Sequence, residues 1–252
     1  MSGPRIAFLI GGVQKGGTTA LAHFMARHPA LALPDGKEAH VFDAPDFPDG
    51  CSQAEVDRRY APFFRDCSAQ LWGDATPIYC FHSRFVERIA AYNRQMRWIL
   101  LLRHPVERAI SHYQMERRRG DEHWPFWPAM LLERWRLVGH ACDFSQGSPL
   151  RHYSYRARGD YARQLDAIYR HFPRDQVLVL RSEALAQRPE ATMQQVWSFL
   201  GIAPLSPAPA YGRVFEGGYV AQPRSSLQFR LMRWLMAAQM RRARVMHKID
   251  WR

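Results

Sequence analysis

A glycine-rich loop near the N-terminus constrains the fold more than any other feature of the chain. The run "RIAFLIGG" (residues 5–12) is short, apolar and ended by glycine, which predicts a buried strand. "TTALAHFMARHP" (residues 18–29) follows with helical spacing, because Leu21, Phe24 and Met25 fall on one face. Since the first N–H groups of a helix attract anions, this strand, loop and helix predict a phosphate-binding unit.

The loop itself, "GGVQKGGTTAL" (residues 11–21), departs from the P-loop pattern of triphosphatases, G-x-x-x-x-G-K-[ST]. Thr19 falls in register, but Thr18 occupies the lysine position, and a lysine stands three residues earlier as Lys15. The chain otherwise uses arginine almost throughout. A retained lysine therefore indicates a site that needs a compact ammonium group.

Two later strands end in arginine. "MRWILLLRHP" predicts a buried strand over residues 98–102 followed by Arg103, and "QVLVLRSEAL" predicts a strand over residues 177–180 followed by Arg181. A metal-dependent phosphoryl transferase would place an aspartate at such a strand end to help hold Mg²⁺. Arginine instead contacts an anion directly, so the sequence predicts anion binding without a metal.

Arg103 is followed by "VERAISHYQMERRRG", which predicts a helix with Ser111 about a turn and a half from its start. We expect Arg103 and Ser111 to reach one phosphate group together. The alternative for Arg103 is an ion pair with Glu107 at the surface, which the spacing favours when Arg103 is considered alone.

"KEAHVFD" (residues 37–43) brings a carboxylate and an imidazole close together. In an extended segment Glu38 and His40 point to the same face, because side chains alternate. Such a pair suits general-base chemistry on a hydroxyl group. A loop with scattered polar groups is the alternative, and spacing alone favours it.

Strands that alternate with helices predict an α/β protein, here a P-loop-like three-layer fold with a central, mainly parallel sheet flanked by helices. We expect a single domain over residues 1–252, with an aromatic-rich helical insertion near residues 121–147 and a basic C-terminal helix over residues 226–252. The insertion either packs in the core or lines an acceptor site with Trp124, Phe126, Trp127 and Trp135.

The formal net charge of +12 predicts an anionic partner. The cysteines are scattered, with no C-x-x-C pair and no zinc spacing. The apolar run at the N-terminus is too short for a signal peptide, and no stretch approaches the ~20 apolar residues of a membrane span. The sequence therefore indicates a soluble, cytoplasmic protein.

Four segments together resemble a known family: "QKGGTTAL", "KEAHVFD", "GDATPIY" and "LLRHPVERAISHY". They are similar to sulfotransferases that use 3′-phosphoadenosine 5′-phosphosulfate (PAPS), above all the heparan-sulfate type and its bacterial relatives. The likeness runs from Ile6 to Leu200, and the first and last segments are specific as a pair. It implies a P-loop-like α/β fold, PAPS as co-substrate and a carbohydrate or small-molecule alcohol as acceptor.

The resemblance also implies roles for single residues. The 5′-phosphosulfate is bound by the loop residues Lys15, Gly16, Gly17, Thr18 and Thr19. Arg103 and Ser111 bind the 3′-phosphate. Glu38 is the catalytic base, His40 orients or stabilises the sulfuryl group, and Lys15 neutralises charge on the leaving phosphate.

The chain departs from the heparan-type pattern in two places. Ala75 stands where those relatives carry a lysine that contacts cofactor and substrate, so the resemblance does not specify a glycosaminoglycan acceptor. The late loop that completes the 3′-phosphate site is replaced by "GGYVAQPRS" (residues 217–225), in which Arg224 is the candidate ligand.

Two other classes of function remain open. A P-loop kinase of small molecules is one, although the missing lysine and strand-end aspartates speak against it. The other is a non-enzymatic protein that binds polyanions through the arginine-rich tail of residues 229–252. We expect no specific nucleic acid partner, and this tail forms either a solvated helix face or a contact with a membrane surface.

Overall fold

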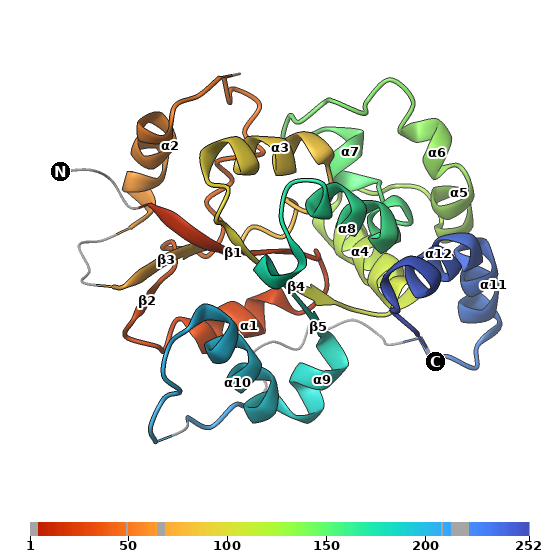
Figure 1. Cartoon of the computed structure of the whole chain (residues 1–252). Coiled ribbons are helices and arrows are strands. Elements are labelled where there is room, and N and C mark those ends of the chain that lie inside the picture. Colours follow the sequence, from red (N-terminus) through yellow and green to blue (C-terminus); the bar gives the residue numbers. More distant parts are fainter. Residues whose placement is uncertain (1–4, 49, 65–68, 208, 213–221, 252) are drawn as a thin grey trace. The chain divides into compact units, whose positions relative to one another are not determined.

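The computed structural model describes the chain except for residues 1–4, 49, 65–68, 208, 213–221 and 252 (Figure 1). The chain divides into two compact units. The first comprises Met1–Arg103 and Ala167–Glu216, and the second comprises His104–Asp166 and Gly217–Arg252. Each unit has its own cluster of buried apolar side chains.

The first unit contains a five-stranded sheet in the order β2-β3-β1-β4-β5, and every paired strand runs parallel to its neighbour. This confirms the predicted α/β fold with a mainly parallel sheet. The strands are β1 (Ile6–Gly12), β2 (Leu31–Ala32), β3 (Leu71–Asp74), β4 (Arg97–Leu102) and β5 (Val177–Arg181).

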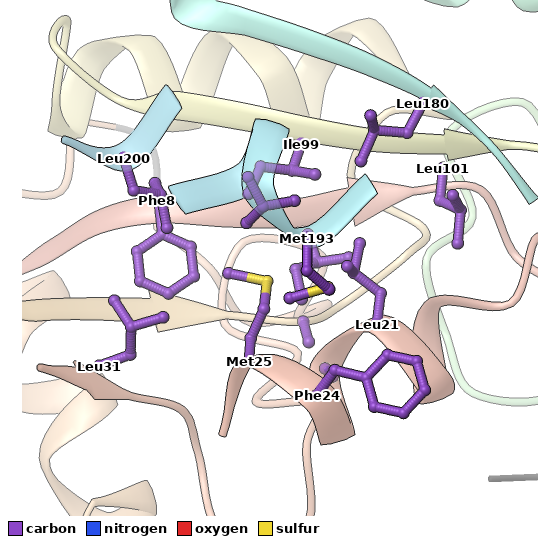
Figure 2. Close-up of a cluster of buried hydrophobic side chains, with 14 of the residues drawn as sticks. Phe8, Leu21, Phe24, Met25, Leu31, Ile99, Leu101, Leu180, Met193 and Leu200 are labelled. Atoms are coloured by element: carbon purple, nitrogen blue, oxygen red, sulfur yellow. The ribbon is translucent and has the colours of Figure 1, made fainter. Parts of the chain in front are cut away.

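Helices flank both faces of this sheet. Ile99 and Leu101 face a core built with α1 and α10 (Figure 2). Trp98, one residue away from Ile99 on β4, packs its ring against Phe172. On the opposite side of the sheet from α1 and α10 lies α3 (Figure 1). The helices of this unit are α1 (Thr18–Met25), α2 (Gln53–Tyr60), α3 (Ser83–Tyr92), α9 (Ser182–Gln187) and α10 (Pro189–Leu200).

The second unit is helical in the residues that are described. Its longest helix is α4 (Pro105–Arg119), which begins with the proline expected at a first turn. The predicted insertion forms two short helices, and the C-terminal segment forms two helices joined at Met236 where one was expected. These helices are α5 (Phe126–Leu131), α6 (Glu133–Arg136), α7 (Pro149–His152), α8 (Tyr161–Tyr169, which crosses the unit boundary), α11 (Leu227–Leu235) and α12 (Ala237–His247).

The parallel sheet determines where chemistry can gather. Because all five strands run the same way, their carboxyl ends meet at one edge, where ligands of such folds bind. β1 lies between β3 and β4. The strands β2 and β3 are on one side of β1 and the strands β4 and β5 are on the other, so the strand order reverses beside the glycine loop. Among the described helices, none combines the length and the apolar character that crossing a bilayer would require.

Candidate active site

The glycine loop connects β1 to α1 by a tight turn. The N–H of Gly16 donates to the carbonyl of Val13 at 2.8 Å, so this amide is used within the loop and does not face a ligand. Lys15 adopts a left-handed conformation (φ 66°), as does Gly17 (φ 93°), the residue before α1. Among the described residues no side chain caps α1, so the first N–H groups of the helix, on Thr18 and Thr19, have no acceptor within it.

Gly16 is required by a close approach of two backbones. A Cβ atom at this position would lie 2.3 Å from the carbonyl oxygen of Leu101 and 2.8 Å from that of Val13. The N–H of Val13 also donates to Leu101 at 3.1 Å. The loop is therefore held against the end of β4, and the start of α1 lies at the edge where β4 and β5 end.

The segment after β2 places Glu38 between two cations. Its Oε1 lies 2.5 Å from Lys37 Nζ, and its Oε2 lies 3.2 Å from His40 Nε2. The pairing of Glu38 with His40 was predicted from alternating side chains along an extended segment. That reason is wrong, because the segment is not extended. Lys37 (φ 82°) and His40 (φ 53°) are both left-handed, and the chain turns back so that the two side chains meet.

These contacts assign protonation states. Burial alone would lower the pKa of His40, but hydrogen bonds to Asp43 and Glu38 raise it to about 9, so the imidazole is cationic at neutral pH. Burial opposes ionisation of Glu38, yet the hydrogen bond from His40 and the charge of Lys37 lower its pKa overall. Glu38 is thus an ionised acceptor of protons, and His40 is a cation rather than a base.

The structure adds residues to this site that sequence reasoning missed. Asp43 is fully buried and lies 2.9 Å from His40 Nδ1. Asp74, at the end of β3, is also fully buried and accepts a hydrogen bond from Thr76 at 2.7 Å. The signal for Asp74 and Thr76 is polar residues directly after a buried strand, but Tyr60, which also contacts Asp74, carries no local signal.

The expected 3′-phosphate ligands are divided between the units. Arg103 directly follows β4 and is the last residue of the first unit, whereas Ser111 lies buried in α4 of the second. Within the second unit, Arg224 pairs through Nη2 with Glu107 at 2.8 Å. The joint role of Arg103, Ser111 and Arg224 stays a prediction, and residues 217–221 of the late loop lie outside the described residues.

The aromatic insertion packs mainly within the second unit. Trp124, Phe126 and Trp127 lie against its apolar cluster. Trp135 stacks on Trp124 with centroids 6.4 Å apart, yet 70% of its surface is exposed. Packing therefore explains most of these side chains, and Trp135 is the one that the second unit leaves at its surface.

One group of potential metal ligands occurs in the second unit. Glu116, Asp121 and His152 place one ligand atom each within 4.8 Å of one another. Glu116 Oε2 lies 2.8 Å from His152 Nδ1, so a hydrogen bond already accounts for the closest contact. His152 Nε2 contacts the carbonyl oxygen of Gln146 at 2.9 Å.

The strand order and the loop after β1 define a class of α/β protein in which a glycine-rich loop leads from a central strand into the first helix. Comparison with known proteins specifies the class further. Residues 5–209 match the family model described as a sulfotransferase domain. The chain therefore belongs to the PAPS-dependent sulfotransferase family, a family of transferases of the EC 2.8.2 type.

Three relatives illustrate the range of similarity. The mouse heparan sulfate glucosamine 3-O-sulfotransferase 3B1 is 32% identical over 195 residues, covering 77% of this chain and 45% of the relative. The human bifunctional heparan sulfate N-deacetylase/N-sulfotransferase 2 is 31% identical over 210 residues, covering 78% and 22%. The sulfotransferase structure from Alicyclobacillus acidocaldarius has a TM-score of 0.75 at 25% identity, covering 98% of this chain and 97% of that one. The chain thus spans less than half of each of these two curated relatives but nearly all of the bacterial structure.

Proposed function

We propose that this protein transfers a sulfuryl group from PAPS to the hydroxyl group of an acceptor. The acceptor oxygen forms a bond to sulfur while the bond between sulfur and the 5′-phosphate oxygen breaks. Glu38 takes the hydroxyl proton, His40 stabilises negative charge on the sulfuryl oxygens, and Lys15 stabilises the leaving phosphate oxygen. The products are the sulfated acceptor, 3′-phosphoadenosine 5′-phosphate (PAP) and a proton.

The observation that carries the proposal is the pairing of Glu38 with a cationic His40 across 3.2 Å. An ionised carboxylate can accept a proton, and an imidazolium beside it can bind a sulfuryl oxygen. The start of α1 and Lys15 fit the anionic donor, because uncapped N–H groups and an ammonium attract a phosphosulfate. Support for a reaction without metal comes from Arg103 and Arg181, which stand where phosphoryl transferases place carboxylates.

The first experiment tests the base. Glu38→Gln should lower turnover by roughly 10²–10⁴-fold, because the amide cannot accept the proton. Sulfate transfer is measured by mass spectrometry with PAPS and a panel of carbohydrate, phenol, lipid and alcohol acceptors. Glu87→Gln, on the exposed side of α3, is the control and should leave turnover unchanged. A Glu38→Gln variant with near-normal turnover would show that the base is another residue.

The second experiment tests the donor site. PAP should raise the melting temperature strongly, whereas adenosine 5′-phosphate, which lacks the 3′-phosphate, should raise it much less. Equal shifts would contradict the roles of Arg103 and Ser111. Mg²⁺-dependent hydrolysis of ATP would instead favour a small-molecule kinase, and salt-sensitive binding of polyanions without affinity for PAP would favour the non-enzymatic class.

The acceptor is proposed as a carbohydrate or another alcohol. The names of the curated relatives include both O- and N-sulfation of heparan sulfate, which supports a hydroxyl or an amine on a sugar. Ala75, at the position of the heparan-type lysine, is buried in the core of the first unit. It offers no cation to a polyanionic chain, so we propose a less charged acceptor than heparan sulfate.

A contact with a membrane surface is a second proposal, supported by the outer side of α11. Leu227, Leu231 and Trp234 recur at helical spacing and are exposed, whereas Phe229 and Met232 of the same helix are buried. Exposed arginines flank this apolar stripe at positions 230 and 233. Apolar side chains beside arginines are typical of helices that bind anionic lipid surfaces.

Vesicle sedimentation tests this contact. The protein should bind vesicles that contain phosphatidylglycerol and not vesicles of phosphatidylcholine alone, and Trp234→Ser should weaken binding. Trp135→Ser is the matched control, because Trp135 is exposed to nearly the same extent (70% against 74%) in the same unit. Equal loss in both variants, or equal binding to both vesicles, would contradict the proposal.

A further inference from the structure

One fully buried carboxylate lies beneath the segment that carries Glu38 and His40. Asp74 Oδ2 accepts hydrogen bonds from the hydroxyls of Tyr79 at 2.7 Å and Tyr60 at 2.9 Å. Its Oδ1 accepts from the hydroxyl of Thr76 at 2.7 Å and from the N–H of Ala39 at 3.3 Å. Burial raises the pKa of Asp74, and the bonds from Tyr79, Thr76 and Tyr60 counteract that shift.

The same cluster binds four consecutive backbone amides, those of residues 39–42. Ala39 donates to Asp74 directly, and His40 donates to Thr76 Oγ1 at 3.4 Å. Val41 and Phe42 donate to the Tyr79 hydroxyl at 3.0 and 3.4 Å. These amides belong to no helix or strand, so the shape of the segment depends on side chains that follow β3.

The hydroxyls of Thr76 and Tyr79 donate their protons to Asp74. A hydroxyl group has one proton to donate and two lone pairs that can accept. Their lone pairs then remain for the N–H groups of the segment. Tyr60 also donates to Asp74, but no hydrogen bond joins it to these four amides.

The geometry of the active-site segment needs such support. His40 is held in a left-handed conformation (φ 53°), which costs a residue other than glycine ~1 kcal/mol or more. In that conformation His40 reaches Glu38 through Nε2 and Asp43 through Nδ1. If the amides of residues 39–42 lost their acceptors, the segment would relax and the two contacts would separate.

We propose that Asp74 is a positioning residue, which acts through Tyr79 and Thr76 to hold residues 39–42 in the conformation that places Glu38 beside His40. This inference rests on the proposed role of Glu38 as base, and it names the residues that hold this base in place. Asp74, fully buried, acts on the reaction only through the backbone that it organises.

Two fully buried tyrosines make a matched pair for the test. Tyr79→Phe and Tyr60→Phe each remove one hydroxyl bond to Asp74 Oδ2, but only Tyr79→Phe also removes the acceptor of two amides. Tyr79→Phe should lower kcat by about 10²-fold with little change in the KM for PAPS, on the scale of a misplaced catalytic group. Tyr60→Phe should lower kcat by less than about 5-fold, the scale of one hydrogen bond.

A readout independent of activity separates this inference from the proposed function. Titration of the His40 ring by NMR should give a pKa near 9 in the native protein and in Tyr60→Phe. In Tyr79→Phe the pKa should fall toward that of free histidine, because contacts with Asp43 and Glu38 loosen. An unchanged pKa in Tyr79→Phe would overturn the positioning role even if Glu38 is the base. A lowered pKa would support it even if Glu38→Gln stays active.

Threonine variants keep the test valid if a tyrosine variant does not fold. Thr76→Val removes the acceptor of the His40 N–H at similar volume, and Thr76→Ser restores the hydroxyl. kcat should fall about 10-fold in the valine variant and recover in the serine variant. Asp74→Asn should match or exceed the loss in Tyr79→Phe, because an amide nitrogen cannot accept from a hydroxyl. Equal losses in both tyrosine variants, or no rescue by serine, would overturn the proposal.

Discussion

The glycine loop and the segment of residues 37–43 lie at the same edge of the sheet but are built differently. The loop is shaped by its own backbone, since Gly16 is pressed against the carbonyl of Leu101 and α1 begins without a side-chain cap. The other segment is shaped by distant side chains, because Asp74, Thr76 and Tyr79 bind its amides. The proposed phosphate site is thus encoded in one short motif, whereas the position of the proposed base depends on the packing of several elements.

The largest expected effect on turnover comes from a comparison of one lysine in each region. Lys15→Ala should lower turnover by roughly 10³-fold, because it removes the cation that stabilises the leaving phosphate. Lys37→Ala removes a partner of Glu38 but leaves His40 in contact with it, so turnover should fall by less than about 10-fold. Steady-state rates with PAPS measure both. Equal losses would mean that the two regions do not divide the chemistry as proposed.

A second pair of variants compares backbone constraints. Gly16→Ala should reduce the free energy of unfolding by about 1–3 kcal/mol, because the new methyl group collides with backbone atoms that cannot move aside. Ala39→Gly, in the segment held by side chains, should cost about 0.4–1 kcal/mol through the flexibility of the unfolded chain. Urea denaturation measures both. A fall in the free energy of unfolding below the expected range in Gly16→Ala would show that the backbone of the loop can shift to accept the methyl group.

A third prediction concerns pH. The pKa of His40 is raised from its ordinary value of 6.5 to about 9, so its protonation stabilises the folded state. This contribution is fully present below pH 6.5 and is lost as the pH rises through 9. The melting temperature of the native protein should exceed that of His40→Gln at pH 6, and the gap should close above pH 9.

Removal of Asp43 provides the control for this pH effect. Asp43→Asn removes the negative charge of the carboxylate that raises the pKa of His40 most, so the difference in melting temperature should be smaller and should close at lower pH. A gap that is constant with pH would mean that His40 acts by packing and not by charge.

The smallest expected effect tests whether surface charge also orders the second region. Asp46 pairs with Arg59 at 3.0 Å just after the segment, and its side chain is largely exposed. Asp46→Asn should change the free energy of unfolding by less than ~0.5 kcal/mol, because exposed ion pairs are weak in water. If the free energy of unfolding fell as much in Asp46→Asn as in Gly16→Ala, surface charge would also stabilise the segment of residues 37–43, in addition to the cluster around Asp74.

The comparison explains which predictions from sequence were confirmed. The strands that end at Gly12, Leu102 and Arg181 were predicted from apolar runs and their endings, because a buried parallel strand is encoded by a short local run of apolar residues. The pairing of Glu38 with His40 was expected for the wrong reason. Alternation along an extended chain was assumed, and a left-handed turn held by other elements produces the contact instead.

The division of the C-terminal segment was also not predicted. A continuous basic helix was expected over residues 226–252, and the structure has α11 and α12 with Met236 between them. Met236 is buried among Phe229, Met232 and residues of α4, so packing within the second unit fixes the bend.

The sequence by itself determined the α/β class, the glycine loop and the identity of the acid, the imidazole and the lysine available for chemistry. These follow from local rules, since spacing defines strands and helices, and residue type defines charge. Only the tertiary structure decided that Glu38 stays ionised although it is largely buried, that His40 is a cation and that Asp74 lies beneath them. The hydrogen bonds that shift both pKa values come from neighbours within residues 37–43. The burial of the segment and the turn that brings these neighbours together depend on Asp74, Thr76 and Tyr79, which are distant along the chain and meet the segment only after folding.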